Sequence, residues 1–197
     1  MNDLSDTSAA IRSQLDELSA LVAMVSRELT EEIALVARRS LETLNGGGKL
    51  IFCGNGGSAA DAQHLAAEYV VRFARARRPL PALALTTDTS VLTAAGNDFG
   101  FETIFARQVE ALARPGDLLI LHSTSGESAN LLAAADQARS MGVGTVALLA
   151  KGGGHLKGRV DVALVIPTDV TARAQEIHLA IGHLVCEVVD RAFGEDA

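Results

Sequence analysis

Five short apolar runs alternate with longer stretches of helical pattern along most of this chain. The apolar runs are Lys49–Gly54, Ala82–Thr86, Asp117–Ser123, Gly144–Ala150 and Val162–Pro167. Each run is almost continuously hydrophobic, which is typical of strands buried on both faces of a parallel sheet. The helical patterns that separate most of them cover residues 58–76, 88–113 (interrupted around Gly96–Gly100), 128–141 and 171–193. This alternation predicts an α/β fold, a doubly wound sandwich with about five parallel strands.

The first 45 residues have a different, purely helical pattern. One face carries apolar residues spaced alternately four and three apart: Ile11, Leu15, Leu18, Val22, Val25 and Leu29. Thr30, followed by two acidic residues, resembles the N-cap of a second helix, which Gly46–Gly48 ends. The pair either covers the core or forms a subunit interface. We therefore expect a helical segment over 1–48, with an interface role, and a domain over 49–197.

Charge and composition exclude several classes of partner. The 17 Lys and Arg residues against 24 Asp and Glu leave a net charge of −7, which argues against nucleic acid and against an anionic membrane. Seven aromatic residues without Trp do not suit base stacking. No apolar run approaches a membrane span, and no signal peptide is visible at the start. Cys53 and Cys186 lie in apolar runs and form no CxxC motif, so we expect reduced thiols and a cytoplasmic location.

A glycine-rich turn follows the first apolar run. Residues 54–58 read Gly-Asn-Gly-Gly-Ser, and Ser58 opens the next helical stretch. Glycines let a backbone approach a ligand closely, and the free N–H groups of a helix start favour an anion. The pattern matches neither the dinucleotide GxGxxG motif nor a Walker loop. A plain strand-to-helix turn therefore remains an alternative to a binding turn.

A second loop, at the end of the third run, is rich in hydroxyl groups. Its hydroxyl residues are Ser123, Thr124, Ser125 and Ser128. Hydroxyls and backbone N–H groups together can hold phosphate oxygens without a basic side chain. Helix capping would account for one hydroxyl but not for four. We predict a phosphate site here, although Glu127 would repel an anion unless its carboxylate points outward.

Polar side chains at helical spacing suggest the chemistry. His64 and Glu68 lie four residues apart and so on one helix face, as in a metal site or an acid–base pair. Gln175 and His183 lie on an otherwise apolar helix, where polar groups need partners. Their separation of about 12 Å along the axis means that one chain need not join them at one centre. A solvated His–Glu pair remains the alternative.

Two further features stay open. Arg72, four residues after Glu68, lies on the same face of the predicted helix and could reach the site. Asn97 and Asp98 lie in a break flanked by Gly96 and Gly100, which is either a turn or a loop facing a ligand.

Together these segments resemble the sugar isomerase (SIS) domain and, more narrowly, the phosphoheptose isomerases. The resemblance covers about residues 10–193. It is carried by Gly54-Asn55-Gly56-Gly57-Ser58, Asp61-Ala62-Gln63-His64 with Glu68, Leu85-Thr86-Thr87-Asp88-Thr89, Gly96-Asn97-Asp98-Phe99-Gly100, Ser123-Thr124-Ser125-Gly126 with Ser128, and Gln175-Glu176-Ile177-His178 with His183. It implies a flavodoxin-like sandwich and conversion of sedoheptulose 7-phosphate to D-glycero-D-manno-heptose 7-phosphate, the first step of nucleotide-activated heptose synthesis, with lipopolysaccharide as its destination.

The resemblance also implies roles for individual residues. Glu68 and His183 would form the acid–base pair, and one zinc ion would bind His64, Glu68, Gln175 and His183. The sugar phosphate would contact Asn55, Gly56, Gly57, Ser58, Glu68, Arg72, Asn97, Asp98, Ser123, Thr124, Ser125, Ser128 and Gln175. The family typically forms homotetramers with sites at subunit contacts, which would ease the 12 Å separation.

Two residues depart from the family pattern. Glu127 stands where a non-acidic residue is expected, and His122 stands where glycine is common. The competing hypothesis is a non-catalytic SIS-domain protein that binds the replication initiator, of the DnaA-associating type. Such relatives lack the acid–base pair, so the presence of Glu68 and His183 favours the enzyme.

Overall fold

The predicted strands form a single parallel sheet, which confirms the doubly wound α/β fold. The computed structural model describes residues 4–194, and its strands run in the order β2-β1-β3-β4-β5. Their bounds are β1 Leu50–Gly54, β2 Ala82–Ala84, β3 Leu118–Ser123, β4 Gly144–Leu149 and β5 Val162–Val165. In the central β1–β3 pair, Phe52 lies opposite Ile120. This strand order is that of flavodoxin-like sheets.

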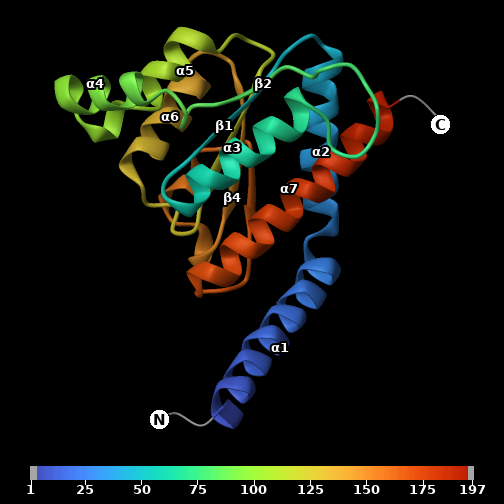
Figure 1. Cartoon of the computed structure of the whole chain (residues 1–197). Coiled ribbons are helices and arrows are strands. Elements are labelled where there is room, and N and C mark those ends of the chain that lie inside the picture. Colours follow the sequence, from blue (N-terminus) through green and yellow to red (C-terminus); the bar gives the residue numbers. More distant parts are fainter. Residues whose placement is uncertain (1–3, 195–197) are drawn as a thin grey trace.

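Helices cover both faces of the sheet (Figure 1). One face carries α2 (Thr30–Asn45), α3 (Gly57–Val70) and α7 (Thr171–Phe193), and the other carries α4 (Thr89–Phe99), α5 (Ala106–Leu112) and α6 (Ala129–Ser140). Each face has its own apolar core. Val36, Leu65 and Ile181 belong to the first core, and Val109 and Leu131 belong to the second. Since successive side chains of a strand point to opposite faces, the continuous apolar runs supply both cores.

The N-terminal helix α1 (Leu4–Glu28) projects away from the body of the molecule at the foot of Figure 1. Its predicted apolar face is largely exposed, with Ile11 at 57%, Leu15 at 60% and Val22 at 49%. In contrast, α2 contributes the buried residues Val36 and Leu44 to the core. The 1–48 segment thus contains one projecting helix and one core helix, and its role as an interface stays a prediction.

The expected N-cap at Thr30 is wrong. Helix α2 does begin at Thr30, but the preceding residue Leu29 occupies the cap position without a side-chain hydrogen bond. The Thr30 hydroxyl instead donates to the Ser26 carbonyl oxygen, 2.7 Å away in α1. A threonine hydroxyl on a helix commonly bonds the carbonyl four residues earlier, and here it does so across the junction of α1 and α2.

The helix predicted over 58–76 also ends early, at Val70. Residues 71–81 form an irregular strap that leads to β2. Arg72 therefore does not lie one helical turn beyond Glu68, and the prediction that the two share a helix face is wrong. Arg72 is exposed in the strap.

A buried ion pair explains why α3 ends there. Arg77 in the strap donates to the carbonyl oxygens of Glu68 (2.6 Å) and Tyr69 (2.9 Å), two groups that a helix end leaves without partners. Its Nε also donates to Asp190 Oδ1 of α7 at 2.7 Å, and both side chains are almost fully buried. Two backbone N–H groups of the strap donate to the other Asp190 oxygen. The strap thus ties the end of α3 to α7.

Helix α4 runs through most of the segment Gly96–Gly100, where a break was predicted, and ends only at Phe99. Asn97 and Asp98 lie inside α4, whose N-terminus is capped by Asp88 accepting from the Val91 N–H at 3.0 Å. The chain turns at Gly100, which has a φ of +90°. Short 3₁₀ turns follow at Phe101–Thr103, and after β4 at Lys151–Gly153 and His155–Gly158.

Two remaining expectations concern membranes and thiols. Over residues 4–194, no helix is long and apolar enough to cross a membrane. Cys53 and Cys186 are free and buried, as predicted. Burial raises the pKa of both thiols, to about 12 for Cys186, so neither is a ready nucleophile.

Candidate active site

A polar pocket opens where the strand order reverses. Strand β1 continues into α3 on one face and β3 into α6 on the other, which leaves a crevice at the carboxyl ends of these neighbouring strands. A hollow of about 110 Å³ lies there. It is lined by Asn55, Ser58, His122, Ser123, Thr124, Ser125, Ser128, Leu131 and Gln175. We call this hollow the cradle. Both loops singled out in the sequence therefore meet at one place.

The glycine-rich turn is needed for close packing. A methyl group on Gly54 would lie 2.6 Å from the Ser58 carbonyl oxygen, and one on Gly57 would lie 2.6 Å from Gln175 Nε2. Gly56 has a φ of +58°, which glycine adopts without strain. The absence of a side chain at Gly57 therefore lets the Gln175 amide of α7 reach the turn after β1.

The hydroxyl loop is folded by its own side chains. The Ser123 hydroxyl accepts the Gly126 N–H at 3.0 Å, and the Ser125 hydroxyl accepts the Glu127 N–H at 3.2 Å. Both hydroxyls act as acceptors in these bonds, so their O–H hydrogens remain free to donate. Ser128 precedes α6 without a side-chain capping bond. Hydroxyl donors at the start of a helix suit an anionic ligand.

Glu127 turns away from the cradle toward the turn after β4. Its carboxylate accepts from the His155 backbone N–H at 3.1 Å and contacts the His155 ring at 2.5 Å. The ring hydrogen bond lowers the pKa of the Glu127 carboxyl. The outward orientation on which a phosphate site depended is therefore present. Two glycines permit this packing, because a methyl group on Gly126 would lie 2.0 Å from the Gly153 carbonyl oxygen.

An amide pair joins the two loops. Asn55 and Asn130 exchange two hydrogen bonds of 2.9 Å, and Asn130 is buried in the first turn of α6. Sequence reasoning missed Asn130, because nothing in its neighbourhood sets it apart from an ordinary helix residue. It also gave no role to Asp61, which it named only as a motif residue and whose Oδ2 is buried without a hydrogen-bond partner. Burial raises the pKa of the Asp61 carboxyl, and the charge of His64 opposes that rise.

The predicted catalytic pair lies on α3 and α7, with Glu68 on α3 and His183 on α7. His64 Nε2 lies 2.8 Å from His183 Nε2 and 3.5 Å from Glu68 Oε1. The Phe73 ring lies against the His183 ring, with centroids 5.6 Å apart. The packing of α3 against α7 therefore brings together an imidazole pair and a carboxylate from residues more than a hundred positions apart, a set able to accept and return protons.

These side chains fit a zinc ion in donor type but are not arranged around one. His64, Glu68 and His183 offer two imidazole nitrogens and a carboxylate oxygen, which are donors that zinc prefers. Within the described part of the chain, however, no group of three or more His, Cys, Asp or Glu residues is placed to hold a metal ion. Gln175 contacts the turn at Gly57 and lines the cradle.

Asn97 and Asp98 are not brought to the cradle. Both are exposed on α4, where Asn97 donates to Asp98 at 2.7 Å. Asp98 lines a separate hollow of about 710 Å³ between α4, α5 and β2. Within one chain, therefore, the predicted ligand residues form a cradle group, a His–Glu–His group and an α4 group, and Arg72 lies apart from all three in the strap.

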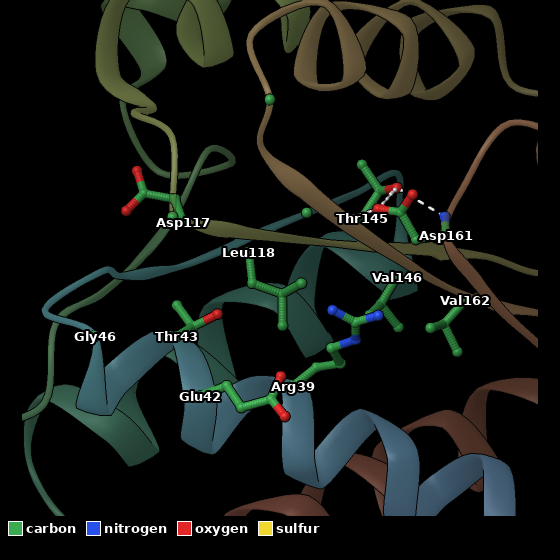
Figure 2. Close-up of a pocket in the computed structure, with 13 residues that line it drawn as sticks. Arg39, Glu42, Thr43, Gly46, Asp117, Leu118, Thr145, Val146, Asp161 and Val162 are labelled. Carbon is green, nitrogen blue, oxygen red and sulfur yellow. Dashed lines mark hydrogen bonds between the residues drawn. The ribbon is translucent and has the colours of Figure 1, made fainter.

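Another hollow lies at the opposite ends of the strands, their amino ends (Figure 2). It measures about 380 Å³ and is lined by Arg39 of α2 and by residues at the amino ends of the strands. Its two aspartates already have partners, because Asp117 accepts the Lys49 N–H and Asp161 accepts the Thr145 N–H. Although this hollow is larger than the cradle, ligands of open α/β sheets bind at the carboxyl ends of the strands. We therefore place the site at the cradle.

Comparison with known proteins assigns the chain to a family. The doubly wound sheet sets the fold class, and the SIS domain family matches residues 14–150, which makes this a SIS-domain protein. The chain is 51% identical over 199 residues to the phosphoheptose isomerase of Roseiflexus sp. (strain RS-1), with 100% of both chains covered. It is 52% identical to that of Akkermansia muciniphila, covering 92% of this chain and 95% of the relative. The chain belongs to the phosphoheptose isomerase family, whose members are sugar phosphate isomerases.

Solved structures show the same relationship. The phosphoheptose isomerase from Francisella tularensis superposes with a TM-score of 0.91 at 36% identity, covering 94% of this chain and 98% of that chain. The one from Neisseria gonorrhoeae gives 0.88 at 40% identity, covering 94% and 99%. The family resemblance predicted from the sequence is therefore confirmed.

Proposed function

We propose that this protein converts sedoheptulose 7-phosphate to D-glycero-D-manno-heptose 7-phosphate. One observation carries the proposal: α3 and α7, which hold the His64–Glu68–His183 group, also supply Ser58 and Gln175 to the lining of the cradle. The cradle provides neutral donors for a phosphate, and the second group provides the acid and base that ketose–aldose exchange requires. The names of the relatives support a seven-carbon substrate.

In this mechanism the Glu68 carboxylate removes a proton from C1 of the open-chain ketose. The electron pair forms the C1–C2 double bond of an enediol, while the C2 carbonyl oxygen takes up a proton. Glu68 then returns a proton to C2 as the C1 hydroxyl loses its own, which leaves an aldehyde at C1. His183 manages the protons on the two oxygens, because an imidazole can both donate and accept near neutral pH.

Zinc is the proposed cofactor, with His64, Glu68, Gln175 and His183 as its ligands. Their donor types support this, and zinc when bound supplies a Lewis acid for the oxygens of the enediolate. Metal analysis of the purified protein tests the proposal. About one zinc per chain, reduced in a His64→Ala variant, is the expected result. A full-length protein that stays active after chelation would remove zinc from the scheme.

We further propose a homotetramer with its sites at subunit contacts. Three side chains on α1, Ile11, Leu15 and Val22, expose apolar surface that a second copy would cover. Neighbouring copies could also bring the α4 group to the cradle of another chain, which would give Asn97 and Asp98 their expected contact with substrate.

The experiment that tests the function follows sedoheptulose 7-phosphate by NMR in the presence of the zinc-loaded protein. Appearance of the aldose supports the proposal, and turnover of another ketose phosphate alone would keep the chemistry but change the substrate. Glu68→Gln should fold normally and lose turnover. Glu187→Gln is the matched control, because it makes the same chemical change on α7, where Glu187 pairs with Arg191 at 2.8 Å. Full activity of Glu68→Gln would remove Glu68 from the mechanism.

The product would enter nucleotide-activated heptose synthesis, and we expect this first step to occur in the cytoplasm, with lipopolysaccharide as the destination. The initiator-binding alternative gains no support from the relatives described above. A pull-down with the replication initiator, together with absent isomerase activity, would reverse this order.

A further inference from the structure

Two buried histidines lie side by side behind the cradle. His122 is the residue before the last in β3 and His178 lies on α7, and both are 0% exposed. Their ring centroids are 6.3 Å apart and the planes meet at 78°. Burial lowers the pKa of His122 to about 3 and that of His178 to about 4. Both rings are therefore neutral at physiological pH, and each has one N–H donor and one acceptor nitrogen.

Most of these ring nitrogens have no partner in the described protein. His178 Nε2 lies 3.1 Å from the Leu149 carbonyl oxygen. Because a carbonyl only accepts, Nε2 of the neutral ring carries the hydrogen and Nδ1 is left as an acceptor. His178 Nδ1 and both nitrogens of His122 are buried without a hydrogen bond. Buried polar groups in folded proteins are almost always satisfied, so His122 needs a partner that comes from outside the chain.

His122 borders two hollows that could supply one. The first, of about 20 Å³, lies in the core and is lined mainly by apolar side chains such as Phe52 and Leu148. A single water could fit there, but a stable buried water needs two to four polar partners, and besides His122 itself the lining has only one polar side chain, Tyr69. The second hollow is the cradle, which is larger and mostly polar. The missing partner of His122 therefore comes from the cradle.

Within the set of side chains that line the cradle, His122 is chemically distinct. The others are serines, a threonine, two amides and a leucine, so His122 is the one ionisable group in that set. An apolar side chain of similar size would remove the unsatisfied nitrogens without a penalty. A fully buried histidine is therefore explained better by a ligand than by packing.

We propose that His122 contacts the ligand, donating a hydrogen bond from its neutral ring to an oxygen of the bound sugar phosphate, directly or through one ordered water. This inference rests on the proposed function for the identity of the ligand. The acceptor is either a phosphate oxygen or a hydroxyl of the sugar chain, and the two are distinguished by the test below.

The test compares two variants of His122 with a neighbouring control. His122→Leu keeps the apolar packing and removes the ring nitrogens, whereas His122→Gln keeps a donor. His178→Leu changes the adjacent ring, which does not line the cradle. We expect His122→Leu to unfold at the same urea concentration as the wild type or higher, with KM for sedoheptulose 7-phosphate raised about tenfold and kcat within about threefold. His122→Gln and His178→Leu should keep KM within about threefold.

A spectroscopic measurement on the wild-type protein makes the test independent of variant folding. The ring ¹⁵N resonances of His122 are identified by their loss in His122→Gln. If inorganic phosphate shifts these resonances, the contact is with the phosphate end of the ligand. If the sugar phosphate shifts them and inorganic phosphate does not, the contact is with the sugar hydroxyls. Unmoved His122 resonances would overturn the proposal, and so would an unchanged KM in folded His122→Leu or an equal rise in His178→Leu. Absent turnover by the wild type would instead refute the proposed function, since the phosphate titration would still report on His122.

Discussion

Replacing Arg77 by methionine would break the buried ion pair that joins the strap to α7. The side chains of Arg77 and Asp190 are 2% and 1% exposed, so the variant leaves a carboxylate in the interior without its counter-charge. Removing one partner of such a pair costs roughly 3–5 kcal/mol. Because two backbone N–H groups still donate to Asp190 Oδ2, we expect a loss near the lower end, about 3 kcal/mol. That is a large part of the total stability of a domain, about 5–15 kcal/mol.

Urea unfolding followed by circular dichroism measures this loss. Arg77→Met should lower the unfolding midpoint by about 1 M or more. Arg72→Met is the matched control, since Arg72 is exposed on the same strap, and it should change the free energy of unfolding by less than about 0.5 kcal/mol. The double variant Arg77→Met with Asp190→Leu should recover most of the loss, because an apolar pair replaces an ionic one.

The same pair predicts a dependence on pH. Burial raises the pKa of Asp190, but hydrogen bonds from the Arg75 N–H, the Arg77 side chain and the Ala74 N–H outweigh it, and the net pKa is below its ordinary value. A lowered carboxyl pKa stabilises the fold above the unfolded-state value and loses that effect as pH falls through the folded-state value. Arg77→Met should therefore lose less stability than the wild type on acidification. A loss under 1 kcal/mol for Arg77→Met at neutral pH, or a double variant weaker than the single one, would refute this reasoning.

Three further predictions concern other parts of the molecule. The folded-state pKa values of His122 and His178 lie below that of an exposed histidine, so on acidification the unfolded chain takes up protons before the folded protein does. The free energy of unfolding should therefore fall by about 1 kcal/mol per ring as the pH drops from 7 to 5.5. Urea unfolding at both pH values measures this loss, and we expect a smaller loss in His122→Leu. Gly126→Ala should lower the free energy of unfolding by about 3 kcal/mol or more and weaken phosphate binding, because the new methyl group would lie 2.0 Å from a carbonyl oxygen. Gly152→Ala, at a φ of +78° with open space around it, should lower the free energy of unfolding by only about 1 kcal/mol. Equal shifts of the melting temperature for the two variants would contradict this. Leu15→Glu should reduce the mass of the assembly in light scattering while leaving the fold intact, and an unchanged mass would exclude the exposed face of α1 as an interface.

The sheet could be predicted because the apolar runs carry their own evidence. A strand buried on both faces must be hydrophobic at every position, and no distant residue is needed to see this in residues 118–121. The ends of the helices were harder to predict from the sequence. The pattern after α3 continues to favour a helix, but Arg77 takes up the last carbonyls of that helix and the chain turns away.

The site was predictable in chemistry more than in arrangement. Four hydroxyls in one loop exceeded what capping requires, and the loop does line the cradle. The orientation of Glu127 depends on His155, 28 residues later, and the Asn55–Asn130 pair joins residues 75 positions apart. A sequence pattern reports on neighbours along the chain, so contacts between loops of different strands could not be read from it. The glycines at 152–154 show the same limit, because two of them pack against the hydroxyl loop and nothing in the neighbouring sequence indicates that contact.

The strand order has a consequence for synthesis on the ribosome. Strand β1 is an inner strand, with β2 and β3 as its neighbours, but β3 ends at Ser123, 69 residues after β1 ends at Gly54. At about 5–20 residues per second, one edge of β1 lacks its partner for roughly 3–14 seconds during translation. The helix that covers much of the first face, α7, is completed only at Phe193. A nascent or truncated chain therefore exposes an apolar strand edge to chaperones and to other nascent chains, and premature termination anywhere before β3 yields a polypeptide that cannot close its sheet.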